Sequence, residues 1–310
     1  MKNKIIKPTL SIGIPAHNEE GNIEFLLKSI FRQKQHFFIL EKVYVICDSC
    51  TDNTVNIVSR LSKKYKNLKI VERKKKSGKA NNLNLIYKLN QSEYILAIDA
   101  DLVFQKNTDI EEMIKVIAAD KDLNVVVPRH IPVPASSWMG KFAVVSYLSF
   151  ADALWKLNDG NNFYASMATY LLRKKFSKTI HYPKEVQADQ TILYALATRK
   201  NKNAFKLVKN AGVYFRTATT FMDWRILGVR SVLRDKANTV EFFGEEILKE
   251  YHMPRKLFIT SLIKWFFKDP ISTIGSVLMN IYIRKFPLKS KMPVGGLWEP
   301  VESSKVGIQI

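Results

Sequence analysis

Two aspartates separated by one residue follow an apolar segment about one third of the way along the chain. Asp99 and Asp101 come directly after residues 93–98 (EYILAI), which have the composition of a buried strand. The two-residue period of a strand places both carboxylates on the same side of the sheet edge, where they repel each other unless a cation lies between them. The sequence therefore predicts a Mg²⁺ or Mn²⁺ site, with a solvated acidic turn as the alternative.

Polar side chains also follow two earlier strand-like segments. Asp48 comes after residues 42–47 (KVYVIC), and the first strand-like segment ends in the turn 15–20 (PAHNEE), which contains His17. In open α/β sheets ligands bind beyond the carboxyl ends of the strands, so we expect both turns to face one crevice. Asp48 is suited to accept a hydrogen bond from a base or a ribose. A lone histidine such as His17 is more typical of a turn residue held by hydrogen bonds than of a metal ligand.

A basic segment, residues 73–79 (RKKKSGK), leads into a predicted helix. Backbone N–H groups at the start of that helix, together with Lys79, are suited to receive a phosphate. A solvated basic loop is the alternative. The segment lacks the glycine spacing of a P-loop, so a P-loop nucleotide site is not supported.

The chain contains two cysteines, Cys47 and Cys50. Their spacing occurs in redox motifs and in half of a zinc site, but no second cysteine pair completes the usual zinc set. The N-terminus enters a strand-like segment without the apolar stretch of a signal peptide. Together these features favour a reducing, cytosolic setting.

The elements that must position these residues follow a regular rhythm. From residue 9 to about 127, short β-rich runs alternate with helical patterns, which predicts a parallel, twisted sheet with helices on both faces. A proline-rich connection follows Pro128. Beyond it we expect a helix over 138–157, a strand around 163–173, a helix around 186–200, a strand over 204–216, an arginine-bearing helix over 221–236, and helical structure over 240–286.

Composition limits the class of protein and the kind of partner. The 310 residues are 46% hydrophobic, which excludes a disordered or collagen-like chain. The 49 Lys and Arg outnumber the 28 Asp and Glu, giving a net charge of +21, which implies an anionic partner such as nucleic acid, anionic lipid or a phosphorylated substrate. The apolar stretches 258–267 and 272–283 are too short to span a membrane.

Taken in order, these motifs resemble those of the family 2 glycosyltransferases, which are inverting enzymes with the GT-A fold. The resemblance covers about residues 9–235. It rests on Pro15-Ala-His-Asn18-Glu19, on Cys47-Asp48-Ser49-Cys50-Thr51-Asp52, on Gly78-Lys79 with Leu83-Asn84, and on Asp99-Ala-Asp101. It implies an α/β fold whose mostly parallel, Rossmann-like central sheet is flanked by helices, with a helical C-terminal region.

The resemblance also implies roles for particular residues. Asp101 and Asp99 would hold a divalent cation, Mn²⁺ or Mg²⁺. Cys47 stands where the family has an aspartate, and Ser49 and Cys50 stand where it has Gly-Ser, so recognition of the base departs from the family pattern. The residues expected to bind the nucleotide-sugar donor are Pro15, Ala16, Asn18, Glu19, Asp48, Lys79, Asp99, Arg230 and Arg234.

The catalytic base of the family is an acidic residue at a helix start. Residues 187–190 (QADQ) fall where that residue is expected, and Asp189 is therefore the candidate base. Its task would be to deprotonate an acceptor hydroxyl as that hydroxyl attacks the anomeric carbon. The alternative is an ordinary acidic residue in the first turn of a helix, because the glutamate that usually precedes the base is Ala188 here.

The arginine-bearing helix lacks the full Gln-x-x-Arg-Trp motif of processive synthases, which disfavours a processive polymerase. Arg230 and Arg234 are one helical turn apart and share a face that would meet a diphosphate, a lipid phosphate or solvent.

Further along, apolar residues flanked by lysines and arginines suit an anionic membrane surface, and packing on the catalytic domain is the alternative. We therefore expect a catalytic domain over 1–238, divided into a nucleotide-sugar half of about 1–127 and an acceptor half of about 128–238, and a basic amphipathic helical region over 239–310.

These features together predict a metal-dependent, inverting glycosyltransferase. The donor would be a nucleotide-sugar, UDP-linked, and the acceptor a hydroxyl of an envelope saccharide or lipid-linked saccharide met by a peripheral enzyme at the cytoplasmic face of the membrane. Two alternatives are a basic nucleic-acid-binding protein and a catalytically silent nucleotide-sugar binder. Nucleic acid is not expected as a partner, because aromatic residues are not interleaved with the basic segment 73–79.

Overall fold

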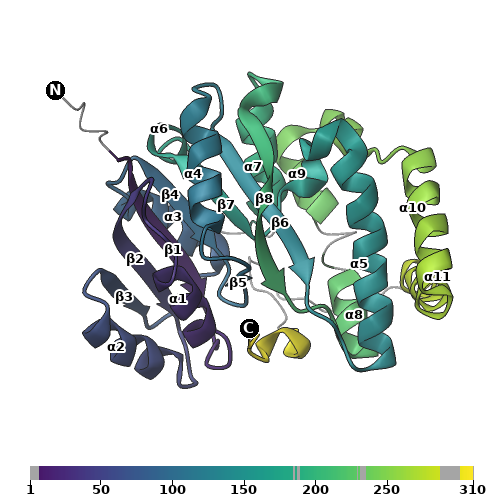
Figure 1. The fold of residues 1–310 in the computed structure, drawn as a ribbon, viewed down its shortest axis with the longest axis horizontal. Helices are drawn as coiled ribbons and strands as arrows, with labels where there is room; N and C mark the ends of the chain where they lie inside the picture. The colour runs from purple at the N-terminus through teal and green to yellow at the C-terminus, as the bar shows by residue number, and fades with distance from the viewer. Residues whose placement is uncertain are drawn as a thin grey trace.

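The computed structural model describes residues 7–183, 186, 189–228, 230, 235–286 and 301–309. Within these residues one eight-stranded sheet runs through the molecule in the order β3-β2-β1-β4-β7-β6-β8-β5 (Figure 1). Its strands are β1 (Thr9–Ala16), β2 (Ile39–Asp48), β3 (Leu68–Arg73), β4 (Tyr94–Ile98), β5 (Val103–Phe104), β6 (Val125–Pro132), β7 (Thr169–Arg173) and β8 (Phe205–Phe215).

Strand direction divides this sheet into two parts. β3, β2, β1 and β4 are mutually parallel, so their carboxyl ends lie at one edge. β7 is antiparallel to both β4 and β6, β8 is parallel to β6, and the short β5 is antiparallel to β8. The predicted α/β fold with a mostly parallel central sheet is therefore confirmed.

Helices cover both faces of the sheet, and further helices follow it toward the C-terminus. The α-helices are α1 (Ile23–Phe31), α2 (Thr54–Lys64), α3 (Lys79–Leu89), α4 (Asp109–Ala119), α5 (Trp138–Lys156), α6 (Lys174–Ser177), α7 (Asp189–Thr198), α8 (Phe221–Gly228), α9 (Asp235–Phe243), α10 (Arg255–Lys268) and α11 (Pro270–Lys285). Short 3₁₀ turns lie at Leu157–Gly160, Phe163–Ala165, Lys202–Ala204, Glu245–Tyr251 and Glu302–Lys305.

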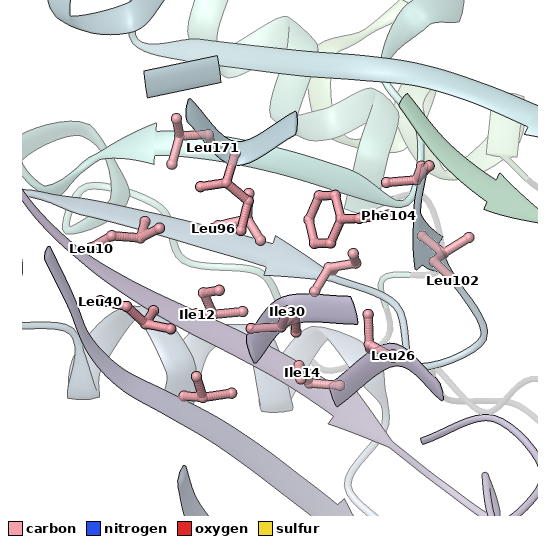
Figure 2. Close-up of a cluster of buried hydrophobic side chains, with 14 of the residues drawn as sticks. Leu10, Ile12, Ile14, Leu26, Ile30, Leu40, Leu96, Leu102, Phe104 and Leu171 are labelled. Atoms are coloured by element: carbon pink, nitrogen blue, oxygen red, sulfur yellow. The ribbon is translucent and has the colours of Figure 1, made fainter. Parts of the chain in front are cut away.

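Alternate residues of the fully buried strand β4 enter two separate hydrophobic cores. Leu96 points into the core beneath α1, α2 and α4, where Ile12 and Ile30 also lie (Figure 2). Ile95 and Ala97 point into the core beneath α3, α5 and α7. The period-two alternation of a strand buried on both faces thus fixes β4 at the centre of the sheet, with Asp99 directly at its end.

One predicted strand is shorter than expected. Residues 163–173 were predicted to be extended, but β7 begins only at Thr169 and Phe163–Ala165 forms a 3₁₀ turn. The side chain of Asn162 explains the difference, because its oxygen accepts from the backbone N–H of Tyr164 at 3.1 Å and its amide donates to the carbonyl of Leu154 at 2.8 Å. Such side-chain bonds to nearby backbone groups compete with strand pairing.

The helices α10 and α11 lie beyond α5 at the edge of the molecule (Figure 1). Ser261 of α10 donates to the carbonyl of Ser149 at 2.6 Å, and Asn280 of α11 donates to the hydroxyl of Ser146 at 2.8 Å. One face of each helix therefore packs on the catalytic fold. Among the described helices, none is long and apolar enough to cross a membrane. The predicted division of the chain at residue 238 stays a prediction.

Candidate active site

The carboxyl ends of β1, β2 and β4 meet at one cavity of about 980 Å³. The parallel register brings the turn after β1, Asp48 and the turn after β4 to this cavity, as the strand-end rule predicts. The predicted donor and metal residues that line it are Pro15, Ala16, Asn18, Glu19, Asp48, Lys79, Asp99, Asp101 and Arg230. Arg234 and residues 187 and 188 lie outside the described residues.

The carboxylate of Asp48 is held by hydrogen bonds from backbone N–H groups. Its carboxylate accepts from the N–H of Ser77 at 2.9 Å and from the N–H of Gly78 at 2.8 Å, and the side chain is buried. Gly78 has a φ of 81°, a left-handed conformation that glycine adopts without strain. These contacts fasten the start of α3 to the end of β2. They occupy two of the amides in this loop, and phosphate binding at the start of α3 stays a prediction.

Lys79 joins the end of β4 to the start of α7. Its ammonium donates to Asp99 Oδ2 at 2.8 Å and lies 3.3 Å from Asp189 Oδ2. Burial lowers the pKa of Lys79, but the carboxylates of Asp189 and Asp99 outweigh that effect and hold it above its ordinary value. Burial raises the pKa of Asp99 to about 6, with Lys79 opposing the change and Asp101 adding to it. The candidate base and the candidate donor residue therefore share one cation.

Asp189 is held at the first turn of α7 with 2% of its surface exposed. The hydroxyl of Tyr170 donates to Asp189 Oδ2 at 2.9 Å, and burial raises the pKa of that phenol well above its ordinary value, so it remains a donor. Both described contacts of the carboxylate thus use Oδ2. The neighbouring residue, Gln190, lines the cavity. Nothing in the sequence marks Tyr170 as a site residue, because a tyrosine in a buried strand is typical of the core.

A second cluster of charges lies at the turn after β1. Glu19 forms an ion pair with Lys305 and accepts from Asn22 Nδ2 at 2.8 Å. Burial and the carboxylate of Asp101 raise the pKa of Glu19 to about 7, although Lys305 opposes the change. Burial lowers the pKa of Arg230, and the negative charge of Asp101 opposes that decrease. Lys305 was not predicted to belong to the site, because no local pattern links it to residues near the N-terminus.

Asp101 lies near enough to the carboxylates of Asp99 and Glu19 to interact with both, and carboxylate oxygens suit a hard divalent cation. Among the described residues, however, no three acidic, histidine or cysteine side chains converge to form a metal site by themselves. A cation at Asp101 would take further ligands from water and from the phosphates of a substrate, which is how proteins commonly hold Mg²⁺. Cys47 is buried in the core and Cys50 lies beside the turn after β1, so within the described chain no zinc set forms around them.

Part of the cavity lining is apolar and mostly aromatic, and it was not predicted from the sequence. It includes Tyr147 and Phe150 of α5, Met167, and Phe215 at the end of β8. The rings of Tyr147 and Phe215 meet edge to face with centroids 4.7 Å apart. In the sequence these residues resemble core residues. We call the part of the cavity lined by the residues after β1, β2 and β4 its charged end, and the part lined by Tyr147, Phe150 and Phe215 its aromatic end.

The sequence matches the model of the glycosyl transferase family 2 over residues 11–180, which is more than half of the chain. The chain belongs to glycosyltransferase family 2. The predicted family and enzyme class are therefore confirmed, and this family 2 enzyme is a nucleotide-sugar transferase.

Curated relatives of this family 2 enzyme match it over limited lengths. It is 27% identical to an uncharacterised protein of Methanocaldococcus jannaschii over 59% of this chain and 70% of that protein. It is 36% identical to the beta-monoglucosyldiacylglycerol synthase of Nostoc over 30% of this chain and 20% of that enzyme. It is 24% identical to the poly(ribitol-phosphate) beta-N-acetylglucosaminyltransferase of Staphylococcus aureus over 67% of this chain and 35% of that enzyme.

Solved structures share the fold of this family 2 enzyme. A mannosyltransferase from Pyrobaculum calidifontis in complex with GDP-Man and Mn²⁺ matches with a TM-score of 0.61 at 16% identity, covering 93% of this chain and 89% of that one. Glucosyl-3-phosphoglycerate synthase from Mycobacterium tuberculosis in complex with Mn²⁺, UDP and phosphoglyceric acid matches with a TM-score of 0.54 at 17% identity, covering 76% of this chain and 78% of that one. Both are GT-A glycosyltransferases, which confirms the fold.

Proposed function

We propose that this enzyme transfers a sugar, with inversion, from a UDP-sugar to a hydroxyl of a lipid-linked acceptor at a membrane surface, with the aid of a divalent cation. The observation that carries the proposal is the convergence at one cavity of Asp99, Asp101, Lys79 and Arg230. Asp189 lies just behind this lining and is linked to it through Lys79. Carboxylates and cations together at the carboxyl ends of parallel strands suit a phosphorylated donor.

In the proposed reaction Asp189 is the base. It takes the proton of the acceptor hydroxyl onto Oδ1, because Tyr170 and Lys79 engage Oδ2. The acceptor oxygen attacks the anomeric carbon from the face opposite the diphosphate, and the bond between that carbon and the phosphate oxygen breaks with its electron pair on the phosphate. Arg230, which lines the same cavity, would stabilise this leaving charge. A divalent cation bound at Asp101 would neutralise part of the same charge.

Binding of nucleotides tests the donor class. We expect UDP to bind in the presence of Mn²⁺ and to bind far more weakly in EDTA, with GDP and dTDP binding at least tenfold more weakly than UDP. Isothermal titration calorimetry of the three nucleotides measures this directly. Tighter binding of GDP would make UDP the wrong donor class, and the failure of all three to bind would overturn the proposed function.

The exposed face of α10 and α11 supports a membrane surface as the place of reaction. Phe267 is 82% exposed and Leu278 is 62% exposed, on the side of these helices that does not pack on α5. The same face carries further exposed apolar side chains, at Ile259, Ile263, Phe266, Ile271, Ile274 and Ile281. Arg284 and Lys285 near the end of α11 are exposed and supply positive charge, whereas Lys264 of α10 pairs with Asp152 of α5. Apolar anchors beside cations suit an anionic bilayer.

The position of the cavity supports a lipid-linked acceptor. Tyr147 and Phe150 of α5, together with Asn280 of α11, line its aromatic end. Helix α11, which carries part of the exposed apolar face, and helix α5, on which α10 and α11 pack, therefore border this end of the cavity. An acceptor anchored in the bilayer would enter the cavity beside α5 and reach the charged end from there.

Sedimentation with vesicles tests the membrane proposal. We expect the enzyme to bind phosphatidylglycerol vesicles, and the double change Phe267→Glu and Leu278→Glu to weaken that binding tenfold or more, because each buried apolar side chain contributes about 1.5–3 kcal/mol. Phe37→Glu is the matched control, since Phe37 is 49% exposed in the segment between α1 and β2, away from α10 and α11. Equal binding by the double variant and the wild type would contradict the proposal.

A further inference from the structure

Residues 301–309 form a short segment that borders the donor end of the cavity; we call it the C-terminal strap. It contains the 3₁₀ turn Glu302–Lys305 and lies between α1 and α8, as the yellow part of the ribbon shows (Figure 1). Val301 and Ile308, near its two ends, are buried. Val301, Glu302, Ser304 and Lys305 line the cavity. The strap is therefore part of the wall of the site.

Specific contacts fix the strap at its first turn. Asp223 of α8 is buried and accepts from the backbone N–H of Ser303 at 3.1 Å, from the N–H of Glu302 at 3.3 Å, and from the hydroxyl of Ser303. The hydroxyl oxygen of Ser303 accepts in turn from the N–H of Thr219 at 2.9 Å. Because the buried carboxylate of Asp223 accepts these hydrogen bonds from Glu302 and Ser303, it determines where the rest of the strap lies.

Further contacts fix the rest of the strap. Arg216 donates to the carbonyls of Val306 and Gly307 at 2.7 and 2.8 Å. The backbones of Gly21 and Gly307 approach so closely that a Cβ on Gly307 would lie 2.2 Å from the carbonyl oxygen of Gly21. Asn22 donates to the carbonyl of Ser304 at 2.8 Å. The strap thus docks closely on the turn after β1.

This docking brings Lys305 into the charged end of the cavity. Its ammonium pairs with Glu19 and donates to the carbonyl of His17 at 3.1 Å. Glu19 is near enough to Asp101 for the two carboxylates to interact. Lys305 is therefore a cation beside the proposed metal position.

Several groups at the start of α3 that could meet a diphosphate already have protein partners. The N–H groups of Ser77 and Gly78, which would otherwise be available to a phosphate, donate to Asp48. Lys79 is shared between two carboxylates. Lys305 pairs with a single carboxylate, and its flexible four-carbon stem lets the ammonium move to a nearby phosphate.

We propose that the C-terminal strap completes the donor site and that Lys305 binds the diphosphate of the donor, exchanging its contact with Glu19 for phosphate oxygens. This inference rests on the proposed function. It assigns Lys305 a role in binding the donor and in stabilising the leaving diphosphate, and it makes Asp223 a positioning residue that acts through the strap.

Calorimetric titration with UDP and with uridine, both with Mn²⁺, tests the role of Lys305. We expect Lys305→Met to weaken UDP binding tenfold or more and uridine binding less than twofold, because the lost contact is to phosphate. Lys305→Arg, which keeps the charge, restores most of the UDP affinity. The matched control is Lys209→Met, since Lys209 pairs with exposed Asp159 on the surface.

A second variant tests the strap without altering Lys305. Asp223→Ala removes the acceptor of the strap's N–H groups, so UDP binding weakens by a similar factor while a cooperative thermal melt shows that the protein is folded. Equal UDP affinity in Lys305→Met and wild type overturns the role of Lys305 and leaves the proposed function standing. An equal loss for UDP and uridine assigns Lys305 a merely structural role and also overturns the inference. If the wild type binds no nucleoside diphosphate, the proposed function itself fails.

Discussion

Asp189→Asn is expected to reduce sugar transfer by about 10³-fold, within the range of 10² to 10⁴ that general bases contribute. Asparagine keeps the shape of the side chain and can still accept from Tyr170, but it cannot take the proton of the acceptor. Asp189 lies beneath the cavity wall rather than among the residues that line it. UDP binding is therefore expected to change less than threefold.

The measurement is transfer of labelled sugar from the donor into a lipid extract of the source cells, together with calorimetric UDP binding. Asp159→Asn is the matched control, because Asp159 is exposed, pairs with Lys209 on the surface, and has a φ of 56°, which asparagine also adopts. Wild-type turnover in Asp189→Asn would leave Asp189 as an ordinary acidic residue in the first turn of α7. A loss of UDP binding equal to the loss of transfer would assign Asp189 to donor binding through Lys79.

Asp101→Asn is expected to weaken UDP binding about a hundredfold in Mn²⁺ and to remove its dependence on the metal. The change deletes one negative charge from a carboxylate that would hold the cation against the diphosphate, while side-chain volume is conserved. EDTA is expected to bring the wild type to the same weak affinity. Calorimetry of UDP in Mn²⁺ and in EDTA measures both effects.

A control variant and the neighbouring carboxylate of Asp99 separate a specific effect of Asp101 from a general loss of charge. Asp122→Asn alters an exposed aspartate after α4 and is expected to leave UDP binding unchanged. Asp99 differs from Asp101 because it forms an ion pair with Lys79, so the structure favours Asp101 as the main protein ligand. Metal-dependent UDP binding that survives in Asp101→Asn would contradict that assignment.

The positions of the acidic turns could be predicted from the sequence because they follow from strand geometry. Apolar segments of fixed period end at Asp48 and Asp99, and parallel strands bring their carboxyl ends to one edge. The place of Asp189 was predicted from the family resemblance. The structure brings it within 3.3 Å of Lys79, although the two residues are 110 positions apart in the chain.

The contacts among these residues could not be predicted, because they depend on packing between distant segments. Nothing in the spacing of residues 48 and 77–78 indicates that the carboxylate of Asp48 is bound by loop amides. The pairing of Glu19 with Lys305 joins residues 286 positions apart. Tyr147 and Phe215, at the aromatic end of the cavity, have the same sequence pattern as residues of the core.

The docking of the C-terminal strap on the turn after β1 has a consequence for the order of folding. Closing a loop of 286 residues costs about 5 kcal/mol of chain entropy, a cost that scales with the logarithm of loop length. The contacts between β1, β2 and β3 span far shorter stretches of chain and can form first. We therefore expect the strap, and with it the donor site proposed above, to form after the β1, β2 and β3 part of the sheet.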